Sequence, residues 1–158
     1  GVGGGLVIDC AGTPMLWDGY HGSAAEVGHM ILDVSGSARV GKPFSFEQLC
    51  SSRAVHFWKD GDALAVEKKA RKGDKAAQDV YDTFGFWVGI GVANIVNVVD
   101  PEVVVIGGSI AKAWDLFEKN MYTSAEKYIV SSAAKKVKIV RAKLGDDAGA
   151  IGAAYLLN

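Results

Sequence analysis

Two side chains near the N-terminus have the types and the spacing to hold a small polar ligand. Glu26 and His29 lie three residues apart around Gly28, so both can face the same ligand. A carboxylate accepts hydrogen bonds from paired hydroxyl groups, and a neutral imidazole can donate or accept one. Taken alone, such a pair is more often an ordinary surface pair, so its meaning depends on the segments around it.

Two glycine-rich turns have the composition of phosphate-binding loops. The first contains Gly3, Gly4 and Gly5, and the second contains Gly107, Gly108 and Ser109. A glycine turn exposes successive backbone N–H groups, which can hold phosphate oxygens without a lysine. The second turn follows the all-β-branched segment 103–106, where the carboxyl edge of a parallel sheet would bring the backbone close to a ligand. Each turn alone is also compatible with a simple chain reversal.

The hydropathy pattern predicts the elements that position these residues. Strands are expected at 6–9, 15–17, 29–33, 103–106 and 137–142, the first two as a hairpin. Helices are expected at 45–58, 63–71, 74–99, 114–130 and 147–157, the first capped by Ser45. Helix 74–99 is apolar almost all round in its second half, which is typical of a buried central helix. The order indicates one compact α/β layer structure.

The composition excludes several classes of protein. The 158 residues include 17 basic and 18 acidic side chains, a formal charge of -1, so no basic surface for nucleic acid is expected. Cys10 and Cys50 have no zinc-ligand spacing and do not indicate a disulfide scaffold. No apolar run reaches the roughly 18 residues of a membrane helix, and no signal peptide opens the chain. A soluble, cytoplasmic protein is expected.

Four segments together resemble the ROK family of bacterial sugar kinases, open reading frames and repressors. They are residues 1–9, 22–30, 94–109 and 144–154, in the order of the family's second phosphate loop, sugar signature, adenosine segment and C-terminal helix. The resemblance spans the whole chain. It implies a ribonuclease-H-like lobe of the actin/hexokinase superfamily, with a mixed sheet and helices on both faces.

The resemblance also implies roles for individual residues. Glu26 and His29 would hydrogen-bond hexose hydroxyls, and Glu47 occupies the place of the family's third sugar contact. Glu47 could equally be a first-turn carboxylate that stabilises its helix dipole. The two glycine turns would contact ATP, which is used with Mg²⁺. The implied reaction is transfer of the γ-phosphate to a hydroxyl of a glucose-like hexose or an N-acetylhexosamine.

One departure from the family concerns zinc. Many members carry three closely spaced cysteines after the histidine and hold a structural zinc ion with them. The corresponding loop, residues 35–47, contains no cysteine, and Cys50 alone cannot form a tetrahedral thiolate site. We therefore expect no metal site and no zinc, with the loop ordered by packing on Phe44 and Phe46.

A second departure concerns catalysis. The family's first phosphate loop and its catalytic aspartate, in an Asn-Asp segment, have no counterpart in the sequence. Residues 1–158 are therefore expected to form the C-terminal lobe, with the N-terminal lobe absent and no catalytic residue of their own. Such a chain would bind sugar and ATP weakly and would be inactive by itself.

Two other functions compete with the kinase. The first is the effector-binding domain of a ROK-type sugar-responsive repressor, and the second is an interaction domain without activity. The intact sugar signature argues against the second, and the missing zinc cysteines favour the kinase over the repressor. Family members usually dimerise or tetramerise through this lobe, so the resemblance is compatible with a homodimer. The sugar itself is not determined by Glu26 and His29, because pocket shape distinguishes one hydroxyl or acetamido group.

Overall fold

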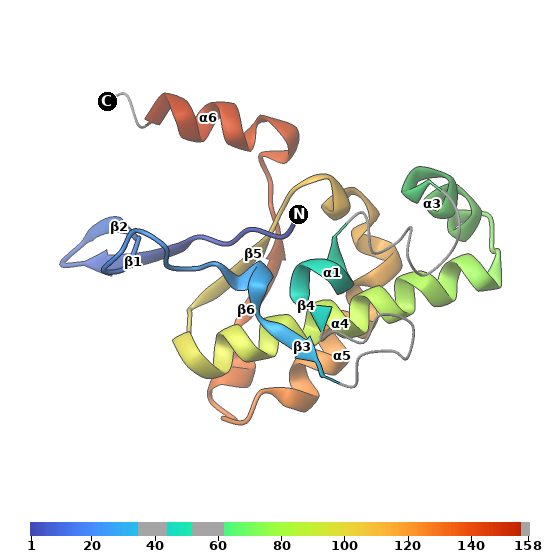
Figure 1. The fold of residues 1–158 in the computed structure, drawn as a ribbon, viewed down its shortest axis with the longest axis horizontal. Helices are drawn as coiled ribbons and strands as arrows, with labels where there is room; N and C mark the ends of the chain where they lie inside the picture. The colour runs from blue at the N-terminus through green and yellow to red at the C-terminus, as the bar shows by residue number, and fades with distance from the viewer. Residues whose placement is uncertain (35–43, 52–61, 156–158) are drawn as a thin grey trace.

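A computed structural model describes residues 1–34, 44–51 and 62–155 (Figure 1). The chain is a mixed α/β structure. Its elements are β1 (Leu6–Cys10), β2 (Thr13–Trp17), the 3-10 helix η1 (Val27–His29), β3 (Ile31–Asp33), β4 (Phe44–Ser45), α1 (Phe46–Cys50), α3 (Ala63–Arg71), α4 (Lys75–Val99), β5 (Val103–Ile106), η2 (Ser109–Ala113), α5 (Trp114–Tyr128), η3 (Ala134–Lys136), β6 (Lys138–Arg141), η4 (Gly145–Asp147) and α6 (Ala148–Tyr155).

The predicted N-terminal hairpin is confirmed. Strands β1 and β2 pair antiparallel, and Cys10 opposes Thr13 across a two-residue turn. Both turn residues, Ala11 and Gly12, have positive φ, which gives the turn the twist that suits a tight hairpin. The Asp9 carboxylate accepts a hydrogen bond from the Gly12 N–H at 2.7 Å and closes the turn. The hairpin projects from the body of the molecule (Figure 1).

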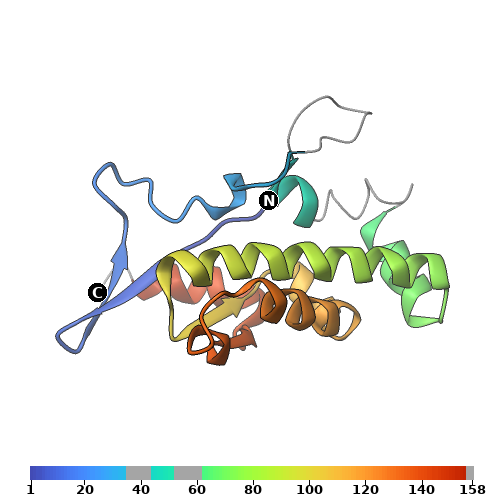
Figure 2. The same ribbon diagram turned by 90° about the horizontal axis from the view of Figure 1, so that it is seen from below.

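Helix α4 forms the centre of the fold, with α5 packed along it (Figure 2). Asp74 caps its first turn by accepting from the Ala77 N–H at 2.8 Å. Gly85 and Gly89 face α5 so closely that a Cβ at either position would overlap the backbone of α5. This close approach lets large side chains fill the space beside the contact, including Phe84 and Phe117, whose ring centroids lie 5.2 Å apart.

The C-terminal end of α4 differs from the sequence expectation. Val98 is 85% exposed and Val99 is 39% exposed, so the last turn is not buried. Helix α4 is also long and apolar enough to span a membrane by length and composition alone. Its buried residues, which run from Ala77 to Val96, explain this composition as that of a core helix.

Strands β5 and β6 pair in parallel, and the parallel sheet expected at 103–106 is present as this two-stranded pair. Val103 opposes Lys138, and Ile106 opposes Arg141. The connection between them contains α5, as a parallel crossover requires. The Tyr122 hydroxyl of α5 donates to the carbonyl of Ile139 at 2.8 Å, which ties the crossover helix to the second strand.

The single mixed sheet expected from the family resemblance is not formed among the described residues. Their strands make three two-stranded sheets, β1–β2, β3–β4 and β5–β6, and only the last is parallel. The hydropathy pattern along a strand predicts which side chains face the core, but it does not predict which other strand lies beside it, because that depends on contacts between distant segments. Strands β1 and β2 pair with each other across their short turn, and the hairpin points away from β5 and β6 (Figure 1).

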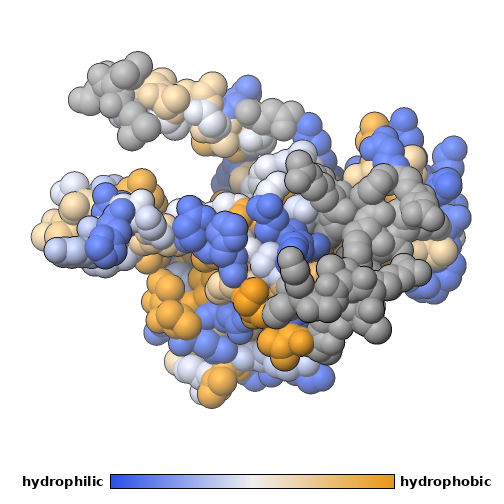
Figure 3. Space-filling view, viewed as in Figure 1, coloured by the Kyte–Doolittle hydropathy of each residue, from blue (hydrophilic) through white to orange (hydrophobic). Residues whose placement is uncertain are grey.

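Apolar surface remains at several places. Figure 3 shows hydrophobic residues over the C-terminal end of α4 and near β3, and helix α6 standing apart from the body. Ile31, Val34 and Val98 are exposed, and no residue of α6 is fully buried within the described range 148–155. The final helix, expected from residue 147 onward, is therefore present and exposed.

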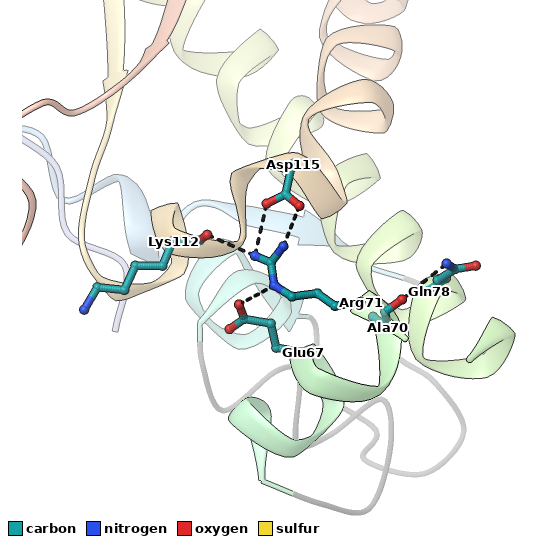
Figure 4. A network of polar contacts seen from close by, with 6 residues as sticks. All are labelled: Glu67, Ala70, Arg71, Gln78, Lys112 and Asp115. Atoms are coloured by element: carbon teal, nitrogen blue, oxygen red, sulfur yellow. Dashed lines mark hydrogen bonds and ion pairs between the residues drawn. The ribbon is translucent and has the colours of Figure 1, made fainter. Parts of the chain in front are cut away.

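An arginine joins α3 to the start of α5 (Figure 4). The Arg71 guanidinium donates to both carboxylate oxygens of Asp115, at 2.6 and 3.1 Å, to the carbonyl of Lys112 at 3.2 Å, and to Glu67 at 2.9 Å. These hydrogen bonds hold the pKa of the Asp115 carboxyl below its usual value. A planar guanidinium is suited to such two-pronged binding.

The contact between α4 and α5 predicts a large effect of one added methyl group. We expect Gly89→Ala to lower the free energy of unfolding by about 1–3 kcal/mol, because its Cβ would overlap Ser124 and Met121. Urea unfolding measures this loss. Gly152→Ala in α6 is the matched control, since no atom lies within 4 Å of its Cβ position. The control should be neutral or gain about 0.5–1 kcal/mol, and equal effects of the two changes would contradict the packing argument.

The Arg71–Asp115 contact predicts a stability difference that disappears in acid. Because the pKa of Asp115 is lowered in the folded chain, the contact stabilises fully above the pKa of an unfolded aspartate, about 3.9. This contribution is lost as the pH falls through the lower pKa of the folded state. We expect Arg71→Gln to lower the Tm near pH 7, and to lower it by less as the pH falls below the pKa of an unfolded aspartate and through the lower pKa of Asp115 in the folded chain. Lys75→Gln, which removes an exposed pair with Asp79 inside α4, should have a smaller effect.

Candidate functional site

A pocket of about 870 Å³ brings most of the sequence-predicted site residues together. One wall is the N-terminal glycine segment (residues 1–5) with Glu26, and another is the turn at Gly107, Gly108 and Ser109. The second half of α4 lies between them and contributes apolar side chains. Residues 1–5 form no turn, contrary to the expectation from the sequence, because the segment runs directly into β1. This glycine segment and the turn at Gly107, more than 100 residues apart in sequence, nevertheless border one cavity.

Glu26 and His29 lie at the two ends of η1. The His29 Nε2 is 3.9 Å from the Glu26 Oε2, and both side chains are exposed, by 79% and 67% respectively. The His29 N–H donates to the Glu26 carbonyl at 3.1 Å, so the backbone turn sets the spacing of the pair. The strand expected from residue 29 begins at Ile31, because His29 belongs to this turn. The pair can accept and donate hydrogen bonds toward a solvent-borne ligand.

Glu47 lies in the first turn of α1, a short helix that a capping box and a buried phenylalanine hold in place. The helix has a capping box, in which Ser45 accepts from the Gln48 N–H and the Gln48 side chain accepts from the Ser45 N–H. Phe46, the residue before Glu47, is buried, and its ring lies where a Cβ on Gly91 would be 2.5 Å from Cζ. Glu47 thus has the first-turn position that favours a carboxylate.

The N-terminal glycine segment connects these elements. The Val2 N–H donates to Oε2 of Glu47 at 2.8 Å. A Cβ on Gly28 of η1 would overlap the Val2 carbonyl, and one on Gly4 would lie 2.7 Å from the carbonyl of Ala25. The structure therefore places Glu26, His29 and Glu47 around the N-terminal segment of residues 1–5. Gly4 and Gly28 allow this segment and η1 to approach each other closely.

The second glycine turn follows β5 directly. Gly108 has φ +79° and ψ -177°, a conformation that side chains with a Cβ strongly disfavour. Its carbonyl accepts from the Ala111 N–H at 3.1 Å, which starts η2. At Gly107 a Cβ would lie 3.2 Å from the Cβ of Ala142, beyond the end of β6. The turn is thus fixed by the parallel strand pair behind it.

Some residues that line the pocket were not among the sequence-predicted site residues. Ser51 after α1 and Trp17 at the end of β2 border it, and Trp17 is 50% exposed. Asn94 of α4 also borders the pocket, and it opens the segment 94–109 on which the family resemblance depends. Its signal in the sequence is a polar side chain within an apolar helical pattern. The nearby Asn97 is structural, because its amide donates to the Tyr128 carbonyl at 3.0 Å and ties α4 to the end of α5.

The sequence predicts that this chain holds no zinc and has no metal site. Loop 35–43, where the family holds zinc, lies outside the described residues, so the absence of zinc stays a prediction. In the described part of the chain, no three His, Cys, Asp or Glu side chains are grouped to hold a metal ion. Cys50 borders the pocket but is buried, and burial raises the pKa of its thiol.

The comparisons with known proteins decide the family. The ROK family model matches residues 1–158, the full length of the chain. The chain belongs to the ROK family. It is 30% identical to a glucokinase of Halalkalibacterium halodurans over 99% of its own length and 53% of that protein. The chain spans about half the length of the curated relatives it matches.

Solved structures show the same fold. A ROK family glucokinase from Streptomyces griseus, in complex with glucose and AMPPNP, superposes with a TM-score of 0.76 at 26% identity, over 98% of this chain and 56% of that one. A ROK family transcriptional regulator, a homologue of E. coli MLC protein, superposes with a TM-score of 0.68 at 22% identity, over 80% and 36%. The fold is therefore that of ROK sugar kinases and is shared by a ROK regulator.

The Gly108 turn predicts a cost that comes from backbone conformation alone. Gly108→Ala should lower the free energy of unfolding by about 1–3 kcal/mol, because alanine disfavours this φ and ψ although no atom lies within 4 Å of the Cβ position. Gly3→Ala is the control, since its Cβ position is equally open and no positive φ is recorded for it. Denaturant unfolding compares the two, and equal stabilities would show that the turn relaxes without strain.

Proposed function

We propose that this chain is the sugar- and nucleotide-binding lobe of an ATP-dependent hexose kinase, most similar to glucokinase. The proposal rests on one pocket that is bordered by Glu26, by the N-terminal glycine segment and by the turn at residues 107–109. A kinase must bring a sugar hydroxyl and the γ-phosphate of ATP together. A cavity that is lined by a candidate sugar contact and by candidate phosphate-binding backbone is suited to that task. Family membership and the relatives named glucokinase support it.

In this proposal each wall has a separate task. Glu26 and His29 hydrogen-bond hydroxyls of the sugar, and Glu47 makes a third contact. Backbone N–H groups of Gly3, Gly4 and Gly5 hold phosphate oxygens, and the turn at residues 107–109 lies against the nucleoside. Mg²⁺ would arrive with the ATP phosphates and neutralise their charge, because Mg²⁺ is usually held by substrate phosphates with one or two carboxylates.

The proposal assigns the general base to a second lobe. The sugar hydroxyl needs a group that accepts its proton during in-line transfer. Since the chain spans about half the length of its curated relatives, we propose that a preceding lobe supplies an aspartate and the opposite wall of the cleft. The complete enzyme would act in the cytoplasm, where ATP and the free sugar meet.

A sugar-responsive regulator is the second candidate. The fold likeness to a ROK transcriptional regulator favours it, because the same pocket could bind a sugar as an effector without phosphorylating it. The two functions differ in what precedes this lobe: an Asn-Asp segment for the kinase, or a DNA-binding helix-turn-helix for the regulator. They also differ in turnover.

The kinase proposal predicts sugar binding by this chain and turnover only with the second lobe. Glucose titration by calorimetry should show binding that Glu26→Ala weakens at least about tenfold, that is about 1.4 kcal/mol. Glu126→Ala, which removes an exposed carboxylate on α5 away from the pocket, is the matched control. Equal binding by the Glu26 and Glu126 variants would contradict the assigned sugar contact.

Turnover is measured as ADP release with ATP, Mg²⁺ and a panel of glucose, mannose, fructose, N-acetylglucosamine and N-acetylmannosamine. We expect activity from a version extended upstream of Gly1 and none from residues 1–158. Sugar binding without turnover in either version would favour the regulator. Turnover by the 158 residues alone would disprove the assignment of the base to another lobe.

A further inference from the structure

Val2 is held between the two elements that carry the sugar-contact candidates. On one side, its N–H donates to Oε2 of Glu47 in α1 at 2.8 Å, in a partly buried contact between residues 45 positions apart. On the other side, its carbonyl lies so close to Gly28 in η1 that any Cβ there would overlap it. Gly3 follows Val2 directly, so these contacts fix the position at which the glycine segment Gly3–Gly5 begins.

The Glu47 carboxylate is well placed to act as an anchor. A Cβ on Gly1 would lie 2.8 Å from its Oε2, which shows how closely the backbone passes the carboxylate. Beneath it, the buried Phe46 and the capping box fix α1. A hydrogen bond from an N–H to an ionised carboxylate is roughly twice as strong as one between neutral groups. Glu47 therefore restrains Val2 from a helix that is itself held in place by its cap and by the buried Phe46.

One carboxylate can serve both the backbone and a ligand. Its two oxygens together offer about four acceptor sites, so a carboxylate can accept from more than one donor. Under the proposed function, a sugar hydroxyl that donates to Glu47 would meet the same group that holds the glycine segment. The candidate sugar contact and the glycine segment that lines the pocket would then be joined through a single side chain.

We propose that Glu47 is a positioning residue for the nucleotide: by holding Val2 it keeps the segment Gly3, Gly4 and Gly5 in the place where its backbone N–H groups receive phosphate. The role is additional to its sugar contact and rests on the proposed function for the identity of the ligand. The restraint on Val2 itself is independent of that function. A residue that only contacted sugar would have no effect on nucleotide affinity when sugar is absent.

Binding of AMPPNP with Mg²⁺, measured by calorimetry without any sugar, tests the role. Glu47→Ala should weaken binding about tenfold, and Glu47→Gln about two- to threefold, because the amide oxygen still accepts from Val2 without the charge. Asp62→Ala is the matched control: it also removes a carboxylate that holds a backbone N–H, that of Leu64 at 3.3 Å, but at the start of α3, away from the pocket. It should leave the affinity within about twofold of the parent chain.

Hydrogen exchange at the amides of residues 2–5 gives a second, ligand-independent readout. Glu47→Ala should accelerate this exchange, whereas Glu47→Gln and Asp62→Ala should not. Equal AMPPNP affinity, or equal exchange, in the Glu47→Ala and Asp62→Ala variants would overturn the proposal. If the parent chain binds no AMPPNP, the proposed function fails, and exchange alone then decides whether Glu47 restrains the glycine segment. Should Glu47→Ala fail to fold, the AMPPNP affinity of Glu47→Gln decides: a loss of about two- to threefold supports the proposal, and an affinity equal to that of the parent chain overturns it.

Discussion

The glycines of α4 let neighbouring backbone approach this helix closely, and this contact holds the fold together. Gly85 and Gly89 let α5 pack directly on α4, and the aromatic core fills in beside that contact. Two residues further along, Gly91 leaves room for the Phe46 ring and so seats α1. Because interiors are packed like organic crystals, a shift of α4 would move both neighbours. One helix therefore sets the position of α5, which leads to β6, and of α1, which carries Glu47.

The candidate site combines glycine backbone with apolar side chains. Its lining includes the segment 1–5, the turn at Gly107 and the second half of α4, and the polar pair beside it, Glu26 and His29, faces solvent. Backbone N–H groups can hold an anion without a fixed positive charge, which agrees with the absence of an excess of basic residues in the composition. The same pocket in a regulator would need no other chemistry to sense a sugar, so catalysis must be distinguished by what completes the cleft.

Side chains nevertheless fix how the elements meet. Arg71 joins α3 to the start of α5 through Asp115, and Tyr122 joins α5 to β6. Asn97 ties α4 to the end of α5. These polar contacts lie around the apolar core rather than inside it, where an unpaired group would be costly. Glu47 does the same for the N-terminal segment through Val2, and there a structural contact coincides with a candidate ligand contact.

Most helices and strands could be predicted from the sequence, because their signals are local: Asp74 three residues before the amide it caps, the Ala11-Gly12 turn, and the apolar run 103–106. The glycine segments and the Glu26–His29 pair could also be recognised there. Strand pairing beyond the hairpin, the exposure of the end of α4, and the contact of Val2 with Glu47 45 positions away are properties of the folded chain. The physical reason is range: caps, turns and periodicity act over a few residues, whereas pairing and pocket formation depend on packing between distant segments.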